Sequence, residues 1–252
     1  MVTGSGITRS GVTGSYTYSV TSDFVNRPVN YVSFWDAARF ANWLHNGQPT
    51  GAQNASTTED GAYLINGYNG SLGQSIQRKP GAKWFIPSED EWYKAAYHKG
   101  HGTNAGYYDY PTSSDTAPGR DLSDPSGNNA NYYGSPYPLD NGKSTTIVGQ
   151  FRNSASPYGT FDQGGNVGEW NEAVPYRDSH VATRCLRGGS FGDVVGTLLA
   201  SDRNRWYAPT TENGIYGFRV AAAVPEPSSL LILAGGILGL AGVIRKGRNR
   251  SH

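Results

Sequence analysis

Residues 162–170 read Asp-Gln-Gly-Gly-Asn-Val-Gly-Glu-Trp, a stretch that mixes turn-forming glycines with oxygen-bearing side chains. Hard cations such as Ca²⁺ prefer several oxygen ligands, which carboxylates, amides and backbone carbonyls supply in loops of this kind. The stretch therefore predicts a calcium site that includes Asp162 and Glu169. A second interpretation needs no metal: Glu169 pairs with an arginine, and Asn166 caps a turn.

Three further segments accompany this stretch in a fixed order along the chain. Residues 28–38 read Pro-Val-Asn-Tyr-Val-Ser-Phe-Trp-Asp-Ala-Ala, and residues 84–96 read Trp-Phe-Ile-Pro-Ser-Glu-Asp-Glu-Trp-Tyr-Lys-Ala-Ala. Residues 187–191 read Arg-Gly-Gly-Ser-Phe, with Gly-Phe-Arg-Val following at 217–220. The ordered set covers Pro28 to Ala222 and resembles the formylglycine-generating (sulfatase-modifying factor) domain family.

The resemblance implies an α+β fold for residues 1–223, an irregular, loop-rich variant of the C-type lectin architecture with bound calcium. It also implies how the metal is held. In one site Asp162 and Glu169 bind through their side chains, and Gly165 and Val167 bind through their carbonyls. A second site falls on four residues in variable loops: Asn131, Tyr132, Asp140 and Gly142.

The positions that carry catalysis in the family differ in this chain. The family's oxidases hold copper(I) through two cysteines after the Gly-Gly-Ser turn, and these positions are Asp193 and Leu198 here. Cys185, the only cysteine, lies before that turn. Other relatives use iron with a histidine cluster, whereas His98 and His101 lack a carboxylate at the spacing of a metal triad. We therefore expect no copper and assign no catalytic residue.

A polar group near the expected cleft is a candidate ligand site. It consists of Asp193, Arg203, Arg205 and Trp206, whose side chains offer hydrogen bonds and one stacking face. The alternative interpretation is a structural network of ion pairs.

Local sequence signals place several secondary-structure elements. Ser33 with Asp36 and Ser88 with Glu91 form two capping boxes, which predict helices that run to about His45 and to just before Gly100. Strands are expected at 83–86, 181–191 and 216–222. Residues 102–165 are rich in Gly, Asn, Ser and Tyr, which predicts ordered irregular loops.

The last 29 residues have the composition of a sorting signal. Val224, Pro225, Glu226 and Pro227 break the fold, an apolar stretch of about 229–244 follows, and four cations end the chain. A helix over that stretch spans roughly 24 Å, close to the ~30 Å of a bilayer's hydrocarbon core. The tail resembles the PEP-CTERM signal, which implies one transmembrane helix and an exosortase as partner. An ordinary membrane anchor or a buried helix is the alternative.

The tail cations and residues 1–20 indicate where in the cell the protein is expected. Because cations stay on the cytoplasmic side, residues before Val224 are expected outside the inner membrane. Residues 1–20 lack the apolar core of a signal peptide, so we expect a longer protein with an upstream leader; post-translational insertion of the tail is the alternative. With 21 Lys and Arg against 20 Asp and Glu, nothing indicates nucleic-acid binding.

Together these observations predict an exported cell-envelope or extracellular protein. Its domain is expected to be non-catalytic, stabilised by calcium, and to bind or scaffold at the cell surface, with extracellular polysaccharide as one candidate ligand. An oxygen- or metal-dependent enzyme with unfamiliar active residues is the alternative.

Overall fold

Both helices begin at the capping boxes that the sequence predicts. α1 (Phe34–His45) follows Ser33, whose hydroxyl accepts from Asp36 N while the Asp36 carboxylate accepts from Ser33 N. α2 (Glu89–Tyr97) starts in the same way after Ser88, with Glu91 as the reciprocal residue. These reciprocal bonds satisfy backbone donors that the first turn leaves unpaired, so they fix where each helix starts.

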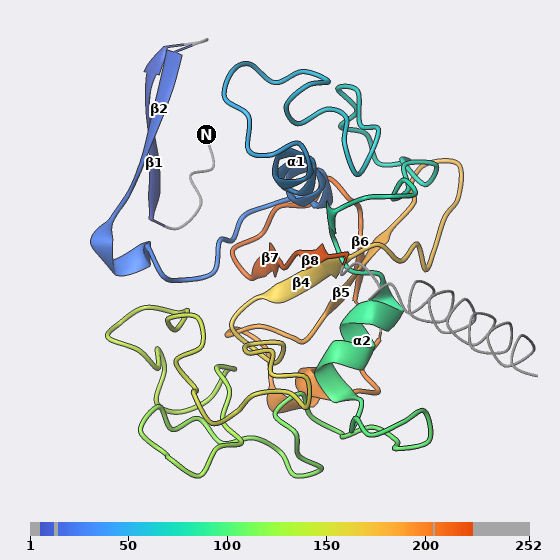
Figure 1. Ribbon diagram of the computed structural model, residues 1–252. Helices are drawn as coiled ribbons and strands as arrows, with labels where there is room; N and C mark the ends of the chain where they lie inside the picture. Colours follow the sequence, from blue (N-terminus) through green and yellow to red (C-terminus); the bar gives the residue numbers. More distant parts are fainter. Residues whose placement is uncertain (1–5, 13–14, 204, 224–252) are drawn as a thin grey trace, which may run out of the picture. The chain divides into compact units, whose positions relative to one another are not determined.

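The computed structural model describes residues 6–12, 15–203 and 205–223 (Figure 1). Its central sheet has four strands in the order β6 (Trp206–Tyr207), β5 (Arg184–Arg187), β4 (Gly168–Asn171) and β7 (Tyr216–Phe218). β4 is antiparallel to β5, with Glu169 opposite Arg187, and parallel to β7, with Glu169 opposite Gly217. Glu169 thus sits in the middle of the sheet.

Shorter elements complete the described chain. The hairpin of β1 (Ile7–Val12) and β2 (Ser15–Val20) precedes a 3₁₀ turn at Ser22–Phe24, and neither was predicted. The strand expected at 83–86 is present as β3 (Trp84–Phe85). Of the strand expected at 181–191 only β5 forms, and 216–222 divides into β7 and β8 (Ala221–Ala222). A second 3₁₀ turn covers Val195–Leu198.

The main core lies where α1 packs on the sheet. Phe34 on α1 contacts Trp170 on β4 edge-on, with ring centroids 6.4 Å apart, and Trp170 contacts Tyr216 on β7 in the same way at 5.7 Å. All three side chains are buried. Edge-to-face pairs of this kind each add about 0.5–1.5 kcal/mol to the free energy of area burial. This aromatic stack therefore anchors β4, which carries Glu169.

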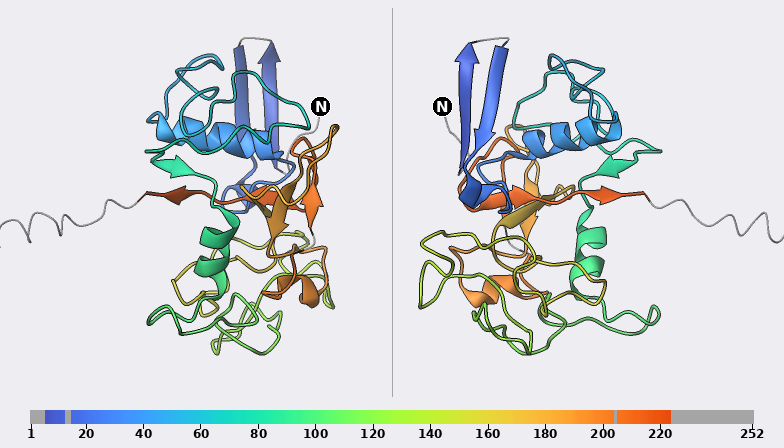
Figure 2. Two further views of the ribbon diagram at one scale, coloured as in Figure 1. Left: turned by 90° about the vertical axis from the view of Figure 1, so that its right-hand side faces the viewer. Right: turned by 60° about the vertical axis from the view of Figure 1, so that its left-hand side comes forward.

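Residues 102–165 form the loops that the sequence predicts, without a helix or a regular strand. In Figures 1 and 2 they lie on the other side of the sheet from α1. Buried polar side chains hold them: Asn129 N donates to Ser154 Oγ at 2.9 Å, and Asn131 Nδ2 donates to Ser144 O at 2.8 Å. Tyr110 and Ala130 pack on Leu198 in a small apolar cluster. The loops are thus ordered by polar contacts more than by an apolar core.

The membrane prediction concerns residues beyond those described. Among residues 6–12, 15–203 and 205–223, none of the helices combines the length and the apolar character that crossing a bilayer requires. The helix expected at about 229–244 and the motif Val224–Pro227 lie outside the described residues.

Candidate functional site

The loop 162–167 leads into β4 and is shaped by two close backbone contacts. Gly165 N donates to Gly188 O at 2.9 Å, and Asn166 N donates to Asn131 O at 2.7 Å. Gly165 has φ +78°, and a Cβ at this position would lie 2.2 Å from Asn131 O. Only glycine fits here, because any side chain would collide with backbone. The loop is thereby fastened between the Gly-Gly-Ser turn and the loop of Asn131.

Glu169 faces a cavity of about 430 Å³ that Asp162 and Arg219 also line. Arg219 Nη2 donates to Glu169 Oε1 at 2.6 Å, and Arg219 Nε donates to Oε2. Trp92 Nε1 donates to the same Oε2 at 2.6 Å. The Glu169 side chain is only 5% exposed. Glu169 therefore makes the arginine pair that the metal-free interpretation requires.

Asp162 is the second carboxylate of this cavity. Its Oδ2 accepts from Gly149 N at 2.6 Å, and Oδ1 has no hydrogen-bond partner among the described residues. Burial raises the pKa of Asp162, while the Gly149 amide and the Arg219 charge lower it in part. Asp162 and Glu169 face a single arginine, Arg219, so the cavity carries an excess negative charge. A bound cation would neutralise this charge. The donor chemistry of this cavity fits calcium, although Arg219 competes for Glu169.

The second predicted metal site shows one unsatisfied oxygen. Asn131 is buried; its Nδ2 donates to Ser144 O and, at 3.0 Å, to Asn166 Oδ1. Asn131 Oδ1 is buried and has no partner in the described part of the chain. Asp140 accepts from Arg27 Nη2 at 2.8 Å. A buried amide oxygen without a donor costs free energy, and a cation would satisfy it.

The other two residues of that predicted site lie in the same loops. The Tyr132 hydroxyl donates to Pro118 O at 2.7 Å, so its side chain is already engaged. Gly142 has φ +77° in the turn that closes with the bond from Lys143 N to Asp140 O at 2.8 Å. Across residues 6–12, 15–203 and 205–223, no cluster of three His, Cys, Asp or Glu side chains is arranged to hold a metal. Either calcium site would therefore depend on backbone and amide oxygens.

The segment after the Gly-Gly-Ser turn takes part in ion pairs. Asp193 accepts from Arg205 Nη1 at 2.9 Å and Nη2 at 2.7 Å, and also from Ser190 Oγ at 2.6 Å. Leu198 is fully buried. These contacts match the network that the sequence left open as an alternative to a ligand site.

Arg203 and Trp206, the remaining members of that candidate group, make other contacts. Arg203 pairs with Glu89 on α2 through Nε at 2.8 Å and Nη2 at 2.9 Å. Trp206 Nε1 donates to Arg203 O at 2.7 Å, and its side chain is 45% exposed. Arg203 is therefore not joined to Asp193 by a hydrogen bond, whereas Arg205 is.

The lone cysteine and the two neighbouring histidines lie in different surroundings. Cys185 is buried on β5, and burial raises the pKa of its thiol to about 11, so it stays protonated at neutral pH. His98 is buried, with Nδ1 2.8 Å from the Tyr158 hydroxyl, whereas His101 is exposed. Within the described part of the chain, neither histidine belongs to a group of three side chains that could hold a metal ion.

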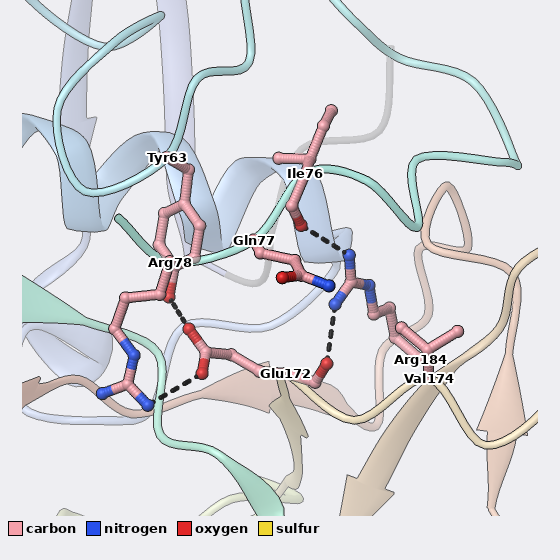
Figure 3. Close-up of a pocket in the computed structure, with 7 residues that line it drawn as sticks. All are labelled: Tyr63, Ile76, Gln77, Arg78, Glu172, Val174 and Arg184. Atoms are coloured by element: carbon pink, nitrogen blue, oxygen red, sulfur yellow. Dashed lines mark hydrogen bonds and ion pairs between the residues drawn. The ribbon is translucent and has the colours of Figure 1, made fainter. Parts of the chain in front are cut away.

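A cavity that motif analysis did not find lies beyond the other end of β4. It measures about 410 Å³ and is lined by Tyr63, Ile76, Gln77, Arg78, Glu172, Val174 and Arg184 (Figure 3). These residues come from four segments of the chain, and none belongs to the motif segments. No local sequence signal predicts the cavity, because its residues meet only in the folded chain.

Comparison with known proteins agrees with this architecture. The family model "Sulfatase-modifying factor enzyme 1-like domain" matches residues 6–224, and the model "PEP-CTERM protein-sorting motif" matches residues 223–246. A search of curated proteins finds no match.

Several solved structures are similar in fold. The crystal structure of CarF has a TM-score of 0.53 at 23% identity, over 81% of this chain and 70% of CarF. Variable protein 1 of Treponema denticola has a TM-score of 0.49 at 21% identity, over 78% of this chain and 71% of its own. PvdO from Pseudomonas aeruginosa has a TM-score of 0.48 at 20% identity, over 86% and 68%. At these identities the likeness to CarF concerns the fold alone.

Proposed function

Because the chain belongs to the sulfatase-modifying factor enzyme 1-like domain family, we propose that it is a non-catalytic member, exported to bind or scaffold at the cell surface. One observation carries this proposal: the two positions where the family's oxidases keep thiols hold Asp193 and Leu198. Asp193 is committed to Arg205 and Ser190, and Leu198 is part of the core. Neither side chain can bind copper(I) as a thiolate does.

Export rests on the PEP-CTERM protein-sorting motif at residues 223–246. The motif implies recognition by an exosortase, a membrane processing enzyme. We place the apolar stretch of about 229–244 in the inner membrane during export, with the domain outside and the cations inside. The exosortase then removes or exchanges the tail, which leaves the domain in the envelope or outside the cell.

Calcium is proposed as a structural ion. Asp162 with the carbonyls of Gly165 and Val167 would hold one ion, with Glu169 contributing if Arg219 is displaced. Asn131, Tyr132, Asp140 and Gly142 would hold a second. A bound calcium would supply positive charge to the Asp162 cavity and a ligand for the Asn131 amide oxygen. Raising calcium from a chelated state should therefore raise the melting temperature, and Asp162→Asn should reduce that gain.

The absence of catalysis is tested directly. The purified chain is incubated with a cysteine-containing sulfatase peptide, oxygen, reductant and copper, and aldehyde is measured by mass spectrometry. A family oxidase with both cysteines serves as the positive control. We expect no aldehyde and no stoichiometric copper. Aldehyde above the level of a no-protein control would overturn the proposal.

A further inference from the structure

The cavity of about 410 Å³ has walls that are fixed by one buried arginine. Arg184 on β5 is 2% exposed, and burial lowers its pKa to about 10, so it remains charged at neutral pH. Its Nη1 donates to Glu172 O at 2.6 Å, and its Nη2 donates to Gly73 O and Ile76 O at 3.0 Å each. Arg184 therefore ties the segment after β4 to residues 73–76 and holds the cavity open.

Three polar groups on one wall are locked to each other. The Tyr63 hydroxyl donates to Glu172 Oε1 at 2.6 Å and accepts from Ile86 N at 2.9 Å. Arg78 Nη2 lies 3.0 Å from Glu172 Oε2. The side chains of Arg78 and Glu172 are 23% and 15% exposed, so both reach solvent in the cavity. Groups fixed in this way lose little freedom when a ligand binds.

Gln77 provides an adaptable contact, which means that its side-chain amide is free to turn toward a ligand. In Figure 3 its amide points between Arg184 and the pair of Tyr63 and Glu172. The side chain is exposed, and it makes no hydrogen bond within the described residues. An amide offers two donors and one acceptor oxygen. Ile76 and Val174 add apolar surface beside these polar groups.

The charged side chains around the cavity are engaged by partners in the protein. Arg78 is shared by Glu172 and Glu91, whose Oε2 lies 2.9 Å from Arg78 Nη2. The lining itself has two arginines, Arg78 and Arg184, and one carboxylate, because Glu91 pairs with Arg78 outside the cavity. Arg184 donates to three backbone carbonyls, so its charge serves the wall and not a ligand. The mixed donors and acceptors that remain match hydroxyl groups, which both donate and accept.

We propose that this cavity binds a neutral, hydroxyl-rich ligand, namely a single unit of a neutral sugar. Glu172 accepts from ligand hydroxyls, Arg78 donates to them, and Gln77 closes over the bound unit with both kinds of contact. The volume of about 410 Å³ falls within the ~300–1,000 Å³ of small-molecule sites. The inference rests on the proposed surface-binding function, because it names the ligand class and the place where that function occurs.

Binding is measured with the full chain in detergent micelles by saturation-transfer NMR and calorimetry. The probes are the methyl glycosides of glucose, galactose and mannose, with glucuronate and inorganic phosphate as charged alternatives. Gln77→Ala removes only the adaptable contact, and Gln48→Ala is the control, since Gln48 is exposed and outside the cavity. Glu172→Gln tests the fixed acceptor, with circular dichroism as the check on folding.

We expect saturable binding of at least one neutral glycoside, about fivefold weaker in Gln77→Ala and unchanged in Gln48→Ala. Glu172→Gln should bind more weakly than the wild type; if that variant does not fold, Gln77→Ala decides alone. The inference is wrong if no neutral glycoside binds, if only glucuronate or phosphate binds, or if Gln77→Ala binds as the wild type does. Retention on a polysaccharide that Gln77→Ala leaves intact refutes this site but not the proposed function, whereas aldehyde formation refutes the proposed function.

Discussion

Glu169 and Glu172 lie three residues apart, within and just after β4, yet their surroundings differ in one decisive way. Each accepts a hydrogen bond of 2.6 Å from an aromatic side chain, Trp92 Nε1 for Glu169 and the Tyr63 hydroxyl for Glu172. Each also meets an arginine at the edge of a cavity. Arg219, however, contacts both oxygens of Glu169, whereas Arg78 contacts one oxygen of Glu172 and shares its charge with Glu91.

The difference separates a structural carboxylate from one that remains available. The lone pairs of Glu169 are taken by Arg219 and Trp92 inside the sheet, so this carboxylate holds β4 to the segment after β7. Glu172 keeps part of its surface in solvent, and burial raises its pKa while Arg78 lowers it only in part. A carboxylate with incomplete charge compensation gains more from a ligand than one whose two oxygens an arginine already contacts.

The largest expected effect comes from breaking the Glu169 pair. Arg219→Ala leaves a carboxylate with a 5% exposed side chain without its cation, which should lower the free energy of unfolding by about 3–5 kcal/mol. Urea unfolding in the presence of a chelator measures it. Arg203→Ala is the control, because its pair with Glu89 involves an arginine that is 62% exposed and should cost less than ~1 kcal/mol. Equal losses for the two variants would contradict a structural role of Glu169.

Much of this architecture, but only one of the two carboxylates, could be predicted from the sequence. The capping boxes at Ser33 and Ser88 are local signals, so both helices were found. The stretch 162–170 is contiguous, so Glu169 stood out, and its pairing with an arginine was one of two stated alternatives. The site of Glu172 depends on Tyr63 and Arg78, whose proximity arises only when the chain folds.

The hairpin β1–β2 and the strand β4 were missed for different reasons. Every residue of β2 is exposed, so the hairpin has no buried face, although Tyr16, Tyr18 and Val20 alternate with Ser and Thr and were an unused strand signal. β4 is buried at all four positions and includes a glycine and a glutamate, a composition typical of loops. β4 forms through hydrogen bonds to β5 and β7, which lie further along the chain, whereas the two strands of the hairpin are separated by only two residues.

A smaller loss is expected from removing the aromatic donor on the Glu172 side. Tyr63→Phe deletes a hydroxyl that donates to Glu172 and accepts from the buried Ile86 N–H. The unpaired amide should lower the free energy of unfolding by about 1–3 kcal/mol. Tyr107→Phe, at a ring that is 48% exposed, is the control and should change little. A loss below that of the control would mean that Tyr63 does not hold Glu172 in place.

Arg78→Ala should cost less than Arg219→Ala although both arginines face a carboxylate. Both arginines are 23% exposed, but Glu91, one partner of Arg78, is 45% exposed and Glu169 only 5%, so solvent replaces more of the interaction that Arg78 loses. We expect a loss of about 1 kcal/mol, part of which reflects the stacking of the guanidinium on the Phe85 ring at 3.9 Å. Arg78→Lys should recover some of it in chemical denaturation. A loss as large as that of Arg219→Ala would erase the distinction between the two carboxylates.

The smallest effect is a pH dependence carried by Glu172. Burial raises the pKa of Glu172 above 4.5 in the folded protein, so the folded state binds the proton more tightly than the unfolded state. This contribution to stability is fully present below pH 4.5 and is lost as the pH rises through the folded pKa. Glu172→Gln does not titrate, so its free energy of unfolding minus that of the wild type should increase with pH in this window. The slope cannot exceed about 1.4 kcal/mol per pH unit for one proton. Urea unfolding of both proteins from pH 4 to pH 8 measures the difference, and a difference that falls with pH would mean that Tyr63 and Arg78 outweigh the effect of burial on the pKa of Glu172.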